Sequence, residues 1–593
     1  MAVPYRRPAN QAIAWLAGLP GARPAPRAPL ARGLAMQASV PPFPVTHEVT
    51  NQPPALADFN LYEANHALQE AVARGGASWA HEELLARGAE LGSAAWIRRG
   101  EDANRNPPVM RPFDRFGHRT DIFEFHPAWH ECMGWLKRHG VDTGAWASPR
   151  PGAHVRRAAL FQLFAEIEPG SLCPTTMTYG AVPPVSREPA LAKHWLPLLL
   201  SPDYDERFIP SVRKRGVTMG MGLTEKQGGS DVRANTSRAA PVLAADPAQT
   251  LGEGWHRIVG HKWFFSAPMC DAFLVTAQEP GGLTCFLMPR WTPDGELNAI
   301  RFQRAKDKMG DRSNAGCEVE FCGALAQRVG EPGRGIRTVL EMATYTRMDC
   351  ANGSAGLMRA ALSQALHHAS HRTAFGLPLR GHPLMRNVLA DMAIEVEAHA
   401  ALAMRVSTAF DRQDDPFETA LRRILTPVAK YWVCKRAPVL GAEAMEVLGG
   451  NGYVEDGPMA RLYRQMPLNA IWEGSGNIMG LDVLRALSRH PESGEALMAE
   501  LEQALGRHGA FDRFVARLSR ELSGGEGIQA RARGLVEDLA LAVQGALLLR
   551  HSPECVSHAF CASRLGGDWG RCFGTLPAAT GFEGVLRRAW PLA

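Results

Sequence analysis

The sequence predicts an α+β protein in which helical domains flank a central antiparallel β domain. Two observations support this fold class. Apolar residues recur every three or four positions before residue 217 and again after residue 335, which is the period of a helix. Between these stretches, short β-branched and aromatic runs alternate with turn residues, which is typical of antiparallel strands.

The chain has 593 residues, which is too long for a single hydrophobic core. We therefore expect several packed units and place their boundaries where the pattern changes. The expected units are an extension over 1–45, an N-terminal helical domain over 46–216, a β domain over 217–335, a helical bundle over 336–489 and a C-terminal helical domain over 490–593.

The first 45 residues are rich in Pro, Ala and Arg, and the first acidic residue is Glu48. This composition predicts a disordered extension. It lacks the apolar segment of a secretory signal. An organelle transit peptide and a tail that contacts acidic partners are the alternatives.

The overall composition is that of a globular protein, with 46% hydrophobic and 21% charged residues. No uncharged apolar run is long enough to span a membrane. The formal net charge of +5 neither requires nucleic acid nor excludes it. Eleven cysteines occur singly, without a C-x-x-C pair, which indicates free thiols in a reducing, cytoplasmic environment.

The expected elements follow in order along the chain. Helical periodicity runs from about Leu61 to Leu200, as in "ALQEAVARGGASWAHEELLARGAELG". The strands are predicted in "WHRIVGHKWFFS", "AFLVTAQ", "TCFLMP" and "CEVEF", with a turn at Gly281-Gly282. Helices resume after Gly335, and breaks are expected at 376–378, 414–416 and 449–452.

The segment "GMGLTEKQGGSDV" over 220–232 is the first candidate binding element. A loop that leaves a strand with two adjacent glycines lets its backbone approach a ligand closely. Thr224 and Ser230 add hydroxyl groups, and successive backbone N–H groups can bind an anion. A polar surface turn explains the same pattern equally well. No helix pattern follows, so this is not a dinucleotide-binding fingerprint.

The segment "GHKWFFSAP" over 260–268 places aromatic rings on both faces of a strand. One face can pack on the core while the other lies against a flat ligand, although core packing alone is the commoner explanation. Ser266 follows the rings and can hydrogen-bond a ring nitrogen or carbonyl.

A third candidate region contains "EAMEVLGGNGYVED" and "RLYRQMPLNAIWEGSGNIM". The glycines at 449, 450 and 452 allow a loop to press its backbone against a phosphate or sugar. Glu473 lies between Trp472 and the flexible Gly474. A carboxylate beside apolar rings tends to have a raised pKa, which suits a general base. A solvated surface charge is the usual role of any single Glu.

Taken together and in this order, these segments resemble the acyl-CoA dehydrogenase family. "TEKQGGSD" resembles its flavin loop, "KWFFS" its strand over the flavin and "IWEGSGNI" its catalytic-glutamate turn, while "RTAFG" and "GGNGY" resemble segments that reach the cofactor of a neighbouring subunit. The match covers roughly Val49 to Leu487. "KDKMGDRSNAGCEVEF" and the additional C-terminal domain resemble the branch associated with the adaptive response to DNA alkylation.

The resemblance implies the acyl-CoA dehydrogenase fold, bound FAD, a homotetramer, binding of double-stranded DNA and weak isovaleryl-CoA dehydrogenase activity. Glu473 would take the α-proton of an acyl thioester while a hydride leaves the β-carbon for the flavin. Arg347 would lie at the substrate, and the neighbouring Thr346 occupies the position from which isovaleryl-type members take their base. The implied cofactor contacts are Met221, Thr224, Ser230, Phe264, Phe265, Ser266, Arg372, Phe375, Glu446, Gly450, Asn469, Trp472 and Ser475.

Two positions depart from the family pattern. Glu446 stands where many members have Gln, and a carboxylate donates no hydrogen bond unless it is protonated. Gln465 stands where an acidic residue is common.

DNA binding is assigned to the C-terminal domain. The segment from Arg507 to Arg533 contains six arginines and only three acidic residues. We predict that Arg513, Arg517 and Arg520 contact the phosphate backbone. A solvated helix with internal ion pairs explains the same composition.

His126 and His130 in "FHPAWHE" have helical spacing but no third ligand, so no metal site is expected.

Three functions remain open from the sequence. The first is a DNA-binding flavoprotein of alkylation resistance with little acyl-CoA turnover. The second is a metabolic dehydrogenase of short or branched acyl-CoA that passes electrons to an electron-transfer flavoprotein. The third is a flavin protein that acts only through protein interactions. The C-terminal helical domain and the segment "TEKQGGSDV" favour the first.

Overall fold

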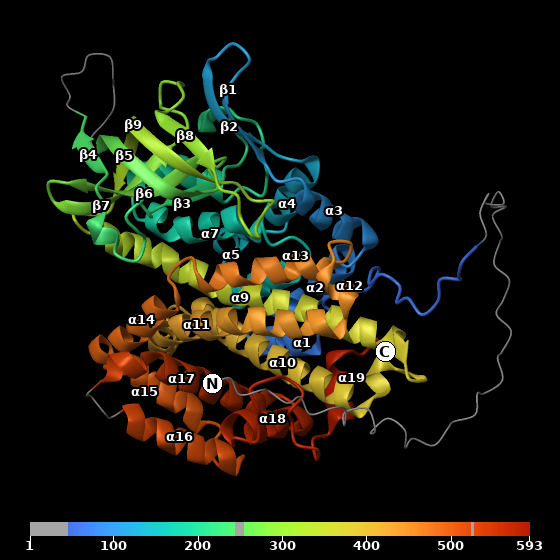
Figure 1. Cartoon of the computed structure of the whole chain (residues 1–593). Helices are drawn as coiled ribbons and strands as arrows, with labels where there is room; N and C mark the ends of the chain where they lie inside the picture. The colour runs from blue at the N-terminus through green and yellow to red at the C-terminus, as the bar shows by residue number, and fades with distance from the viewer. Residues whose placement is uncertain (1–44, 243–253, 523–526, 593) are drawn as a thin grey trace, which may run out of the picture. The chain divides into compact units, whose positions relative to one another are not determined.

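The computed structural model describes residues 45–242, 254–522 and 527–592 (Figure 1). Residues 45–50 belong to a first unit and form no helix or strand. The second unit begins at Asn51. The extension predicted over 1–45 lies outside the described residues, except for Val45.

Helices dominate the segment from residue 51 to 216, as predicted. Their ends follow local chemistry: Asn65 and Ser93 cap α1 and α3 by accepting hydrogen bonds from the first helical turn. The elements are α1 His66–Arg74, η2 Ser78–Ala80, α2 His81–Leu91, α3 Ala94–Arg105, α4 Pro127–Arg138, α5 Gly144–Ala147, α6 Ala153–Ala165, α7 Leu172–Ser186, α8 Pro189–Leu199 and η3 Ser211–Arg213.

A β-hairpin interrupts these helices, which the sequence interpretation missed. Strands β1 Val109–Phe113 and β2 Arg119–Glu124 pair antiparallel. Two prolines at 107 and 108 end the preceding helix because proline cannot continue its hydrogen bonds. Asp114 accepts hydrogen bonds from the backbone N–H groups of Phe116 and His118 and so forms the turn.

The described residues of the central β domain form a seven-stranded sheet in the order β3-β5-β4-β6-β7-β9-β8, with β3 also pairing to β6 and β5 to β9. Most neighbours are antiparallel, as predicted, but β3 and β4 run parallel to β6. Strand β6 runs opposite to β5, so β3, which pairs antiparallel to β5, has the same direction as β6. The strands are β3 Met219–Gly222, β4 Arg238–Pro241, β5 Trp255–Ser266, β6 Ala272–Glu279, β7 Gly282–Pro289, β8 Ile300–Ala305 and β9 Gly316–Val329, with η4 Val232–Ala234 between β3 and β4.

Three long helices form the bundle: α9 Gly335–His371, α10 Pro383–Asp411 and α11 Pro416–Val447. The predicted breaks are confirmed. Strands β10 Thr373–Ala374 and β11 Leu377–Pro378 make a small hairpin followed by η5 Leu379–Gly381, and Asp415 caps α11. After Gly449 come α12 Gly450–Tyr453, α13 Pro458–Gln465, η6 Met466–Ala470 and α14 Gly476–Arg489.

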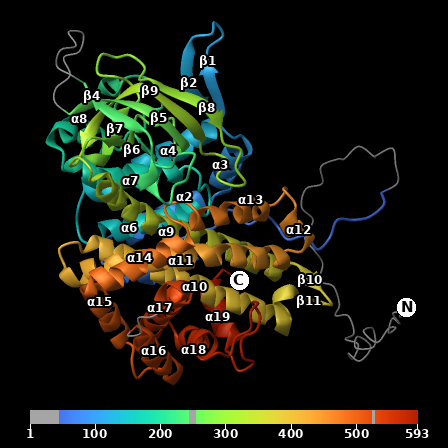
Figure 2. The ribbon, with the colours of Figure 1, turned by 60° about the vertical axis from the view of Figure 1, so that its left-hand side comes forward.

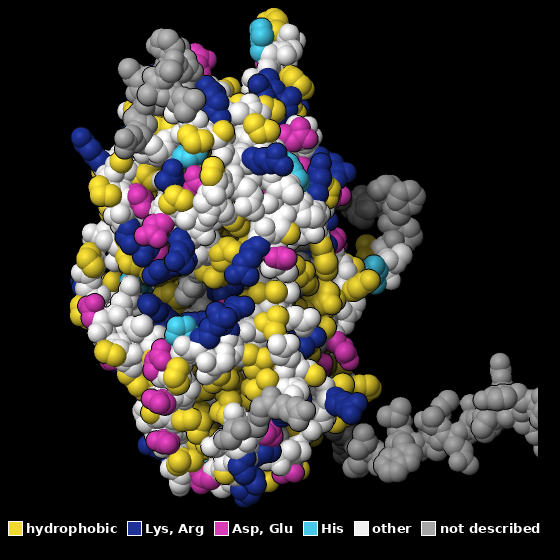
Figure 3. Space-filling view, turned by 90° about the vertical axis from the view of Figure 1, so that its left-hand side faces the viewer, with side chains coloured by type: hydrophobic (Ala, Val, Ile, Leu, Met, Phe, Trp, Pro, Cys, Tyr) yellow, Lys and Arg dark blue, Asp and Glu magenta, His cyan; other side chains and the backbone are white. Residues whose placement is uncertain are grey.

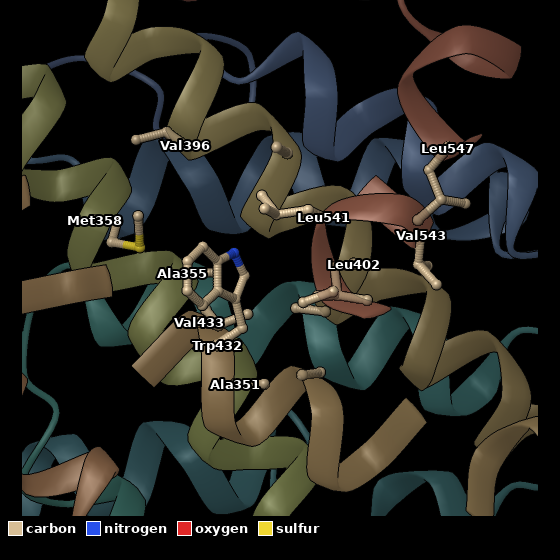
Figure 4. Packing of buried hydrophobic residues seen from close by; sticks show 14 of the residues in the cluster. Ala351, Ala355, Met358, Val396, Leu402, Trp432, Val433, Leu541, Val543 and Leu547 are labelled. Carbon is tan, nitrogen blue, oxygen red and sulfur yellow. The ribbon is translucent and has the colours of Figure 1, made fainter. Parts of the chain in front are cut away.

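The C-terminal helices pack on the side of the bundle away from the sheet, as both ribbon views show (Figures 1 and 2). They are α15 Pro491–Glu502, α16 Gly509–Leu522, α17 Ile528–His551, α18 Glu554–Phe560, the π-helical turn η7 Cys561–Leu565 and α19 Phe582–Ala589. One hydrophobic core joins them to the bundle. Figure 4 shows side chains of this core from four helices: Ala351, Ala355 and Met358 of α9, Val396 and Leu402 of α10, Trp432 and Val433 of α11, and Leu541, Val543 and Leu547 of α17.

Candidate active site

A cavity of about 730 Å³ lies where the sheet meets the bundle. Its walls come from β3 and β5, the 306–316 loop, the first half of α9 and the segment 464–478. The face in Figure 3 is hollowed between the sheet and the helices, and Lys and Arg side chains gather around the hollow. Lys306 and Lys308 are among the cations that line the cavity.

Strand β3 and the loop after it form one wall of the cavity, where β3 presents Met221 and the loop presents Thr224 and Ser230. Gly229 is required for this shape, because a Cβ atom there would lie 2.5 Å from Thr224 Oγ1. Gly229 therefore lets the loop backbone pack closely against the Thr224 side chain.

The aromatic run of β5 divides between core and cavity. The Phe265 ring is fully buried, with its centroid 4.4 Å from that of Phe273. Phe264 is 53% exposed and lines the cavity. A register irregularity between Lys262 and Phe265 accompanies this difference in exposure. Phe265 borders the cavity as well, so its ring packs in the core and also forms part of the cavity wall.

Four hydroxyl groups on the cavity wall have no hydrogen-bond partner within the part of the chain that the structure describes: Thr224, Ser230, Ser266 and Ser475. Unpaired hydroxyls beside an exposed aromatic ring suit a flat ligand with polar edges. FAD has this chemistry, so the residues present fit the expected cofactor.

Asn469 and Trp472 also line the cavity. Trp472 Nε1 donates to Asn469 Oδ1 at 2.9 Å, and Asn469 Nδ2 donates to Ser354 Oγ at 3.1 Å. These contacts fix both side chains. Gln465, the unexplained departure, accepts a 2.6 Å hydrogen bond from the backbone N–H of Asp311. It therefore fastens the 306–316 loop to α13.

Glu473 lines the cavity on the turn before α14 and adopts a left-handed backbone conformation with φ of 60°. Such a conformation is strained for a residue other than glycine and is found most often at functional sites. Burial raises the pKa of the Glu473 carboxyl above its ordinary value, although Arg347, Thr346 and Lys430 act in the opposite direction. A raised pKa makes the carboxylate a stronger base.

Arg347 lines the cavity, but the protein already engages two of its donors. Nε donates to the Glu473 carbonyl at 2.9 Å, and Nη1 donates to Asp482 Oδ2 at 2.9 Å. Arg423 binds the other oxygen of Asp482 at 2.9 Å. These contacts hold the Glu473 turn. Arg347 also borders the cavity, and its contact with a substrate stays a prediction.

The sequence interpretation missed Lys430. This side chain is 1% exposed and donates to the carbonyl oxygen of Gly474. A single lysine in the apolar run "ILTPVAKYWVC" of α11 was the available signal, because a buried charge needs a partner.

A buried ion pair at the cavity wall was missed as well. Arg157 of α6 donates twice to Asp349 of α9, each bond 2.7 Å long, and Thr176 of α7 donates to the same carboxylate at 2.6 Å. Asp349 and Thr176 line the cavity. The three residues therefore join three helices directly behind the site.

Four expected cofactor residues lie outside the cavity. Arg372 lies between α9 and β10, Phe375 is at the turn of the β10–β11 hairpin, and Glu446 and Gly450 are at the junction of α11 and α12. Phe375 is 93% exposed, and Glu446 and Gly450 are exposed as well. The cavity of this chain does not bring them together with Glu473, and their contact with a cofactor stays a prediction.

The three arginines predicted to bind DNA lie on α16. Arg513 and Arg520 are exposed, but Arg517 forms ion pairs with Glu521 and Asp538 at 2.7 and 2.8 Å. These pairs neutralise Arg517, whose side chain also lies over the Phe514 ring.

His126 and His130 have structural roles. His126 caps α4, and His130 lies 2.8 Å from the Tyr204 hydroxyl. Within the described ranges there is no group of three metal-ligating side chains.

No helix in the described ranges has both the length and the hydropathy to cross a bilayer.

Three family models match the chain. The acyl-CoA dehydrogenase middle domain matches 220–323, and the C-terminal domain of the same family matches 333–488. The adaptive response protein AidB N-terminal domain matches 51–206. The chain belongs to the acyl-CoA dehydrogenase family, whose members are FAD-dependent flavoproteins, and it is an oxidoreductase of that type.

Within the family, the chain is 47% identical to AidB of Escherichia coli (strain K12), over 87% of this chain and 94% of that protein. Two solved structures share the fold over most of their length. Caenorhabditis elegans ACDH-11 in complex with C11-CoA has a TM-score of 0.77 at 25% identity and covers 92% of this chain and 93% of that one. Bd2924 in its apo-form has a TM-score of 0.76 at 27% identity and covers 85% and 100%.

Proposed function

We propose that the chain is an AidB-like FAD flavoprotein that binds double-stranded DNA in the adaptive response to DNA alkylation and has weak dehydrogenase activity on a short branched acyl-CoA of the isovaleryl type. The observation that carries the enzymatic part is Glu473. Its carboxyl lines the cavity with a raised pKa, while its backbone is fixed by Arg347.

In the proposed reaction, the Glu473 carboxylate removes the proton from the carbon beside the thioester carbonyl. Bound FAD supplies the two-electron acceptor that the dehydrogenation requires. Met221, Thr224, Ser230, Phe264, Phe265, Ser266, Asn469, Trp472 and Ser475 would hold it, since all of them border the cavity. Thr346 carries no carboxylate, so the base remains Glu473.

Arg347 and Lys430 would orient the base. They bind the carbonyl oxygens of Glu473 and Gly474 and leave the carboxyl free to face the cavity. A base fixed in this way reaches the substrate proton without first ordering its own backbone.

DNA binding is supported by the exposed Arg513 and Arg520 on α16, and by similarity to a protein whose family model is described as an adaptive response protein. The ion pairs of Arg517 make it the weakest of the three predicted contacts. The phosphate backbone attracts such exposed cations regardless of sequence.

We infer a homotetramer from the placement of Arg372, Phe375, Glu446 and Gly450. These residues are expected at a cofactor yet lie in segments outside this chain's cavity, which supports contact across a subunit boundary. Exposed apolar residues occur on the same segments: Phe375, Leu377 and Tyr453. A cytoplasmic location is supported by all eleven cysteines being free thiols.

A metabolic acyl-CoA dehydrogenase that passes electrons to an electron-transfer flavoprotein is the second candidate. The carboxylate of Glu473 keeps this candidate open, since a protein that only binds other molecules has no need of such a base.

One experiment separates the two functions. Purified protein is titrated anaerobically with isovaleryl-CoA while flavin absorbance is recorded, and duplex DNA binding is measured at two salt concentrations. Slow or partial bleaching with DNA binding that weakens in salt supports the proposal. Stoichiometric bleaching without salt-sensitive DNA binding would contradict its DNA part and favour the metabolic enzyme.

A further inference from the structure

The flavin loop, defined here as residues 223–237, connects β3 to β4 and carries Thr224 and Ser230 to the cavity. Its only regular structure is the three-residue turn η4. A segment with so little secondary structure depends on side-chain contacts to hold its backbone in one shape. Many of those contacts converge on one carboxylate, that of Glu225.

The Glu225 side chain is fully buried and accepts five hydrogen bonds. Oε1 accepts from Lys262 Nζ at 2.8 Å and from the Ser237 N–H at 3.2 Å. Oε2 accepts from the N–H and hydroxyl of Thr236, at 2.7 and 3.0 Å, and from Gln227 Nε2 at 2.9 Å. One carboxylate therefore ties the beginning of the loop to its end.

Lys262 ties the loop to the sheet. It lies on β5, two residues before Phe264, and its ammonium group also donates to the Thr276 carbonyl on β6 at 2.9 Å. The adjacent Trp263 N–H donates to the Thr224 carbonyl at 2.8 Å. The pair therefore fixes two elements of the cavity wall relative to each other, namely Thr224 on the loop and Phe264 on the strand.

Neither member of the pair lines the cavity. A buried ion pair is a weak source of stability, because removing two charges from water offsets much of their attraction. It does specify one arrangement of the groups around it, since each alternative leaves a buried charge without a partner. These features point to a role in shaping the loop.

We propose that the Glu225–Lys262 pair holds the flavin loop in its binding shape before FAD arrives, and so sets the affinity for FAD without touching it. The proposal rests on the proposed cofactor contacts of Thr224 and Ser230. A loop that is already ordered loses less conformational entropy when the ligand binds.

The test uses apoprotein of the full chain and four variants. Glu225→Gln and Lys262→Met each remove one charge of the pair. Thr236→Val removes only the hydroxyl contact to Glu225, at nearly constant volume. Asp142→Asn is the matched control: it breaks the equally buried Lys137–Asp142 pair of the N-terminal helical part, which does not line this cavity.

Two measurements are made on each protein. Titration with FAD, followed by the change in flavin fluorescence, gives the dissociation constant. Limited trypsin digestion with mass spectrometry gives the rate of cleavage after Lys226 and Arg233, two exposed trypsin sites within the loop. The second measurement reports the order of the loop without depending on flavin.

We expect Glu225→Gln and Lys262→Met to raise the FAD dissociation constant at least about tenfold and to accelerate cleavage at both loop sites. Thr236→Val should accelerate cleavage about threefold, as expected for one lost hydrogen bond. Asp142→Asn should lower thermal stability but leave FAD affinity and loop cleavage at their wild-type values.

Unchanged affinity and cleavage in Glu225→Gln and Lys262→Met would overturn the proposal. If both variants fail to fold, as judged by circular dichroism, Thr236→Val decides, and wild-type cleavage in that variant would overturn it. Failure of the wild-type protein itself to bind FAD would instead contradict the proposed cofactor site, while the cleavage rates would still report on the pair.

Discussion

Arg347 donates a hydrogen bond from Nε to the backbone carbonyl of Glu473 at 2.9 Å, although the two residues are 126 positions apart in the sequence. Nη1 of the same side chain binds Asp482 at 2.9 Å. One guanidinium thus connects α9 to the turn before α14 while the Glu473 carboxyl faces the cavity. This relationship predicts that the position of the base depends on Arg347.

Replacing Arg347 with Lys should slow flavin bleaching by acyl-CoA by between about tenfold and a hundredfold, because an ammonium group cannot span both acceptors in the geometry of the guanidinium. FAD content, measured by absorbance after purification, should remain at the wild-type value. Arg485→Gln is the control, since Arg485 is half exposed and lies 3.4 Å from Asp482. Equal slowing in both variants would show that the effect is not specific to the Glu473 turn.

The chemistry of Glu473 should follow pH in a defined direction. Because burial raises its pKa above the ordinary value, the carboxyl is protonated and inactive at low pH and becomes a base as the pH rises through the raised pKa. The bleaching rate should therefore have an acid limb above pH 4.5, the ordinary value for Glu. Glu473→Gln should retain FAD and lose acyl-CoA-dependent bleaching. Unchanged bleaching in this variant would remove Glu473 from the mechanism.

The sequence predicted those parts of the molecule that local patterns encode. The order of helical and strand segments follows from residue periodicity, and "TEKQGGSD" and "IWEGSGNI" carry their glycines and polar groups within a few positions. The structure brings both motifs to one cavity. Local patterns do not record which helix faces which, so the ion pair between Arg157 and Asp349, 192 positions apart, was not predicted.

The β1–β2 hairpin had signals that the helical interpretation overlooked, namely two prolines before it and Asp114 at its turn. The role of Arg347 had no such signal. Its partners, the Glu473 carbonyl and Asp482, become neighbours only when α9, α11 and α14 pack together. The same holds for Gln465, whose contact with Asp311 spans 154 positions.

Glu166 predicts a pH dependence of stability. Its side chain is buried, and burial raises its pKa to about 8, although Arg359 acts in the opposite direction. The folded state therefore holds a proton that the unfolded state releases near pH 4.5, so the stability from this group is complete below pH 4.5 and is lost as the pH rises towards 8. Each tenfold difference in proton affinity corresponds to about 1.4 kcal/mol.

Glu166→Gln should remove this dependence. We expect its melting temperature to exceed that of the wild type at pH 8 and to approach it at pH 5, because glutamine has the shape of the protonated carboxyl and no charge. Differential scanning calorimetry between pH 5 and 8 measures the difference. Parallel curves for the two proteins would show that Glu166 does not titrate in this range.

The arginines of α16 predict how DNA binding responds to salt. Arg513 and Arg520 are exposed, whereas Arg517 is paired with Glu521 and Asp538. Replacing Arg513 and Arg520 together with Ala should weaken duplex binding and reduce the slope of log K against log salt by about 1.8, that is, about 0.9 for each lost phosphate contact. Arg517→Ala should change the slope less. An unchanged slope in the double variant would place the DNA surface elsewhere.

The ion pair behind the cavity predicts a non-additive effect on stability. Arg157 is fully buried and Asp349 nearly so, and each is the main charged partner of the other. Arg157→Met or Asp349→Leu alone leaves a buried charge uncompensated and should cost about 3–5 kcal/mol in the free energy of unfolding. The double variant removes both charges at once, so it should be more stable than either single variant. Urea denaturation of the wild type and the three variants measures the coupling. Additive losses would mean that the two side chains contribute independently, and Thr176, which also binds Asp349, would then be the partner that matters.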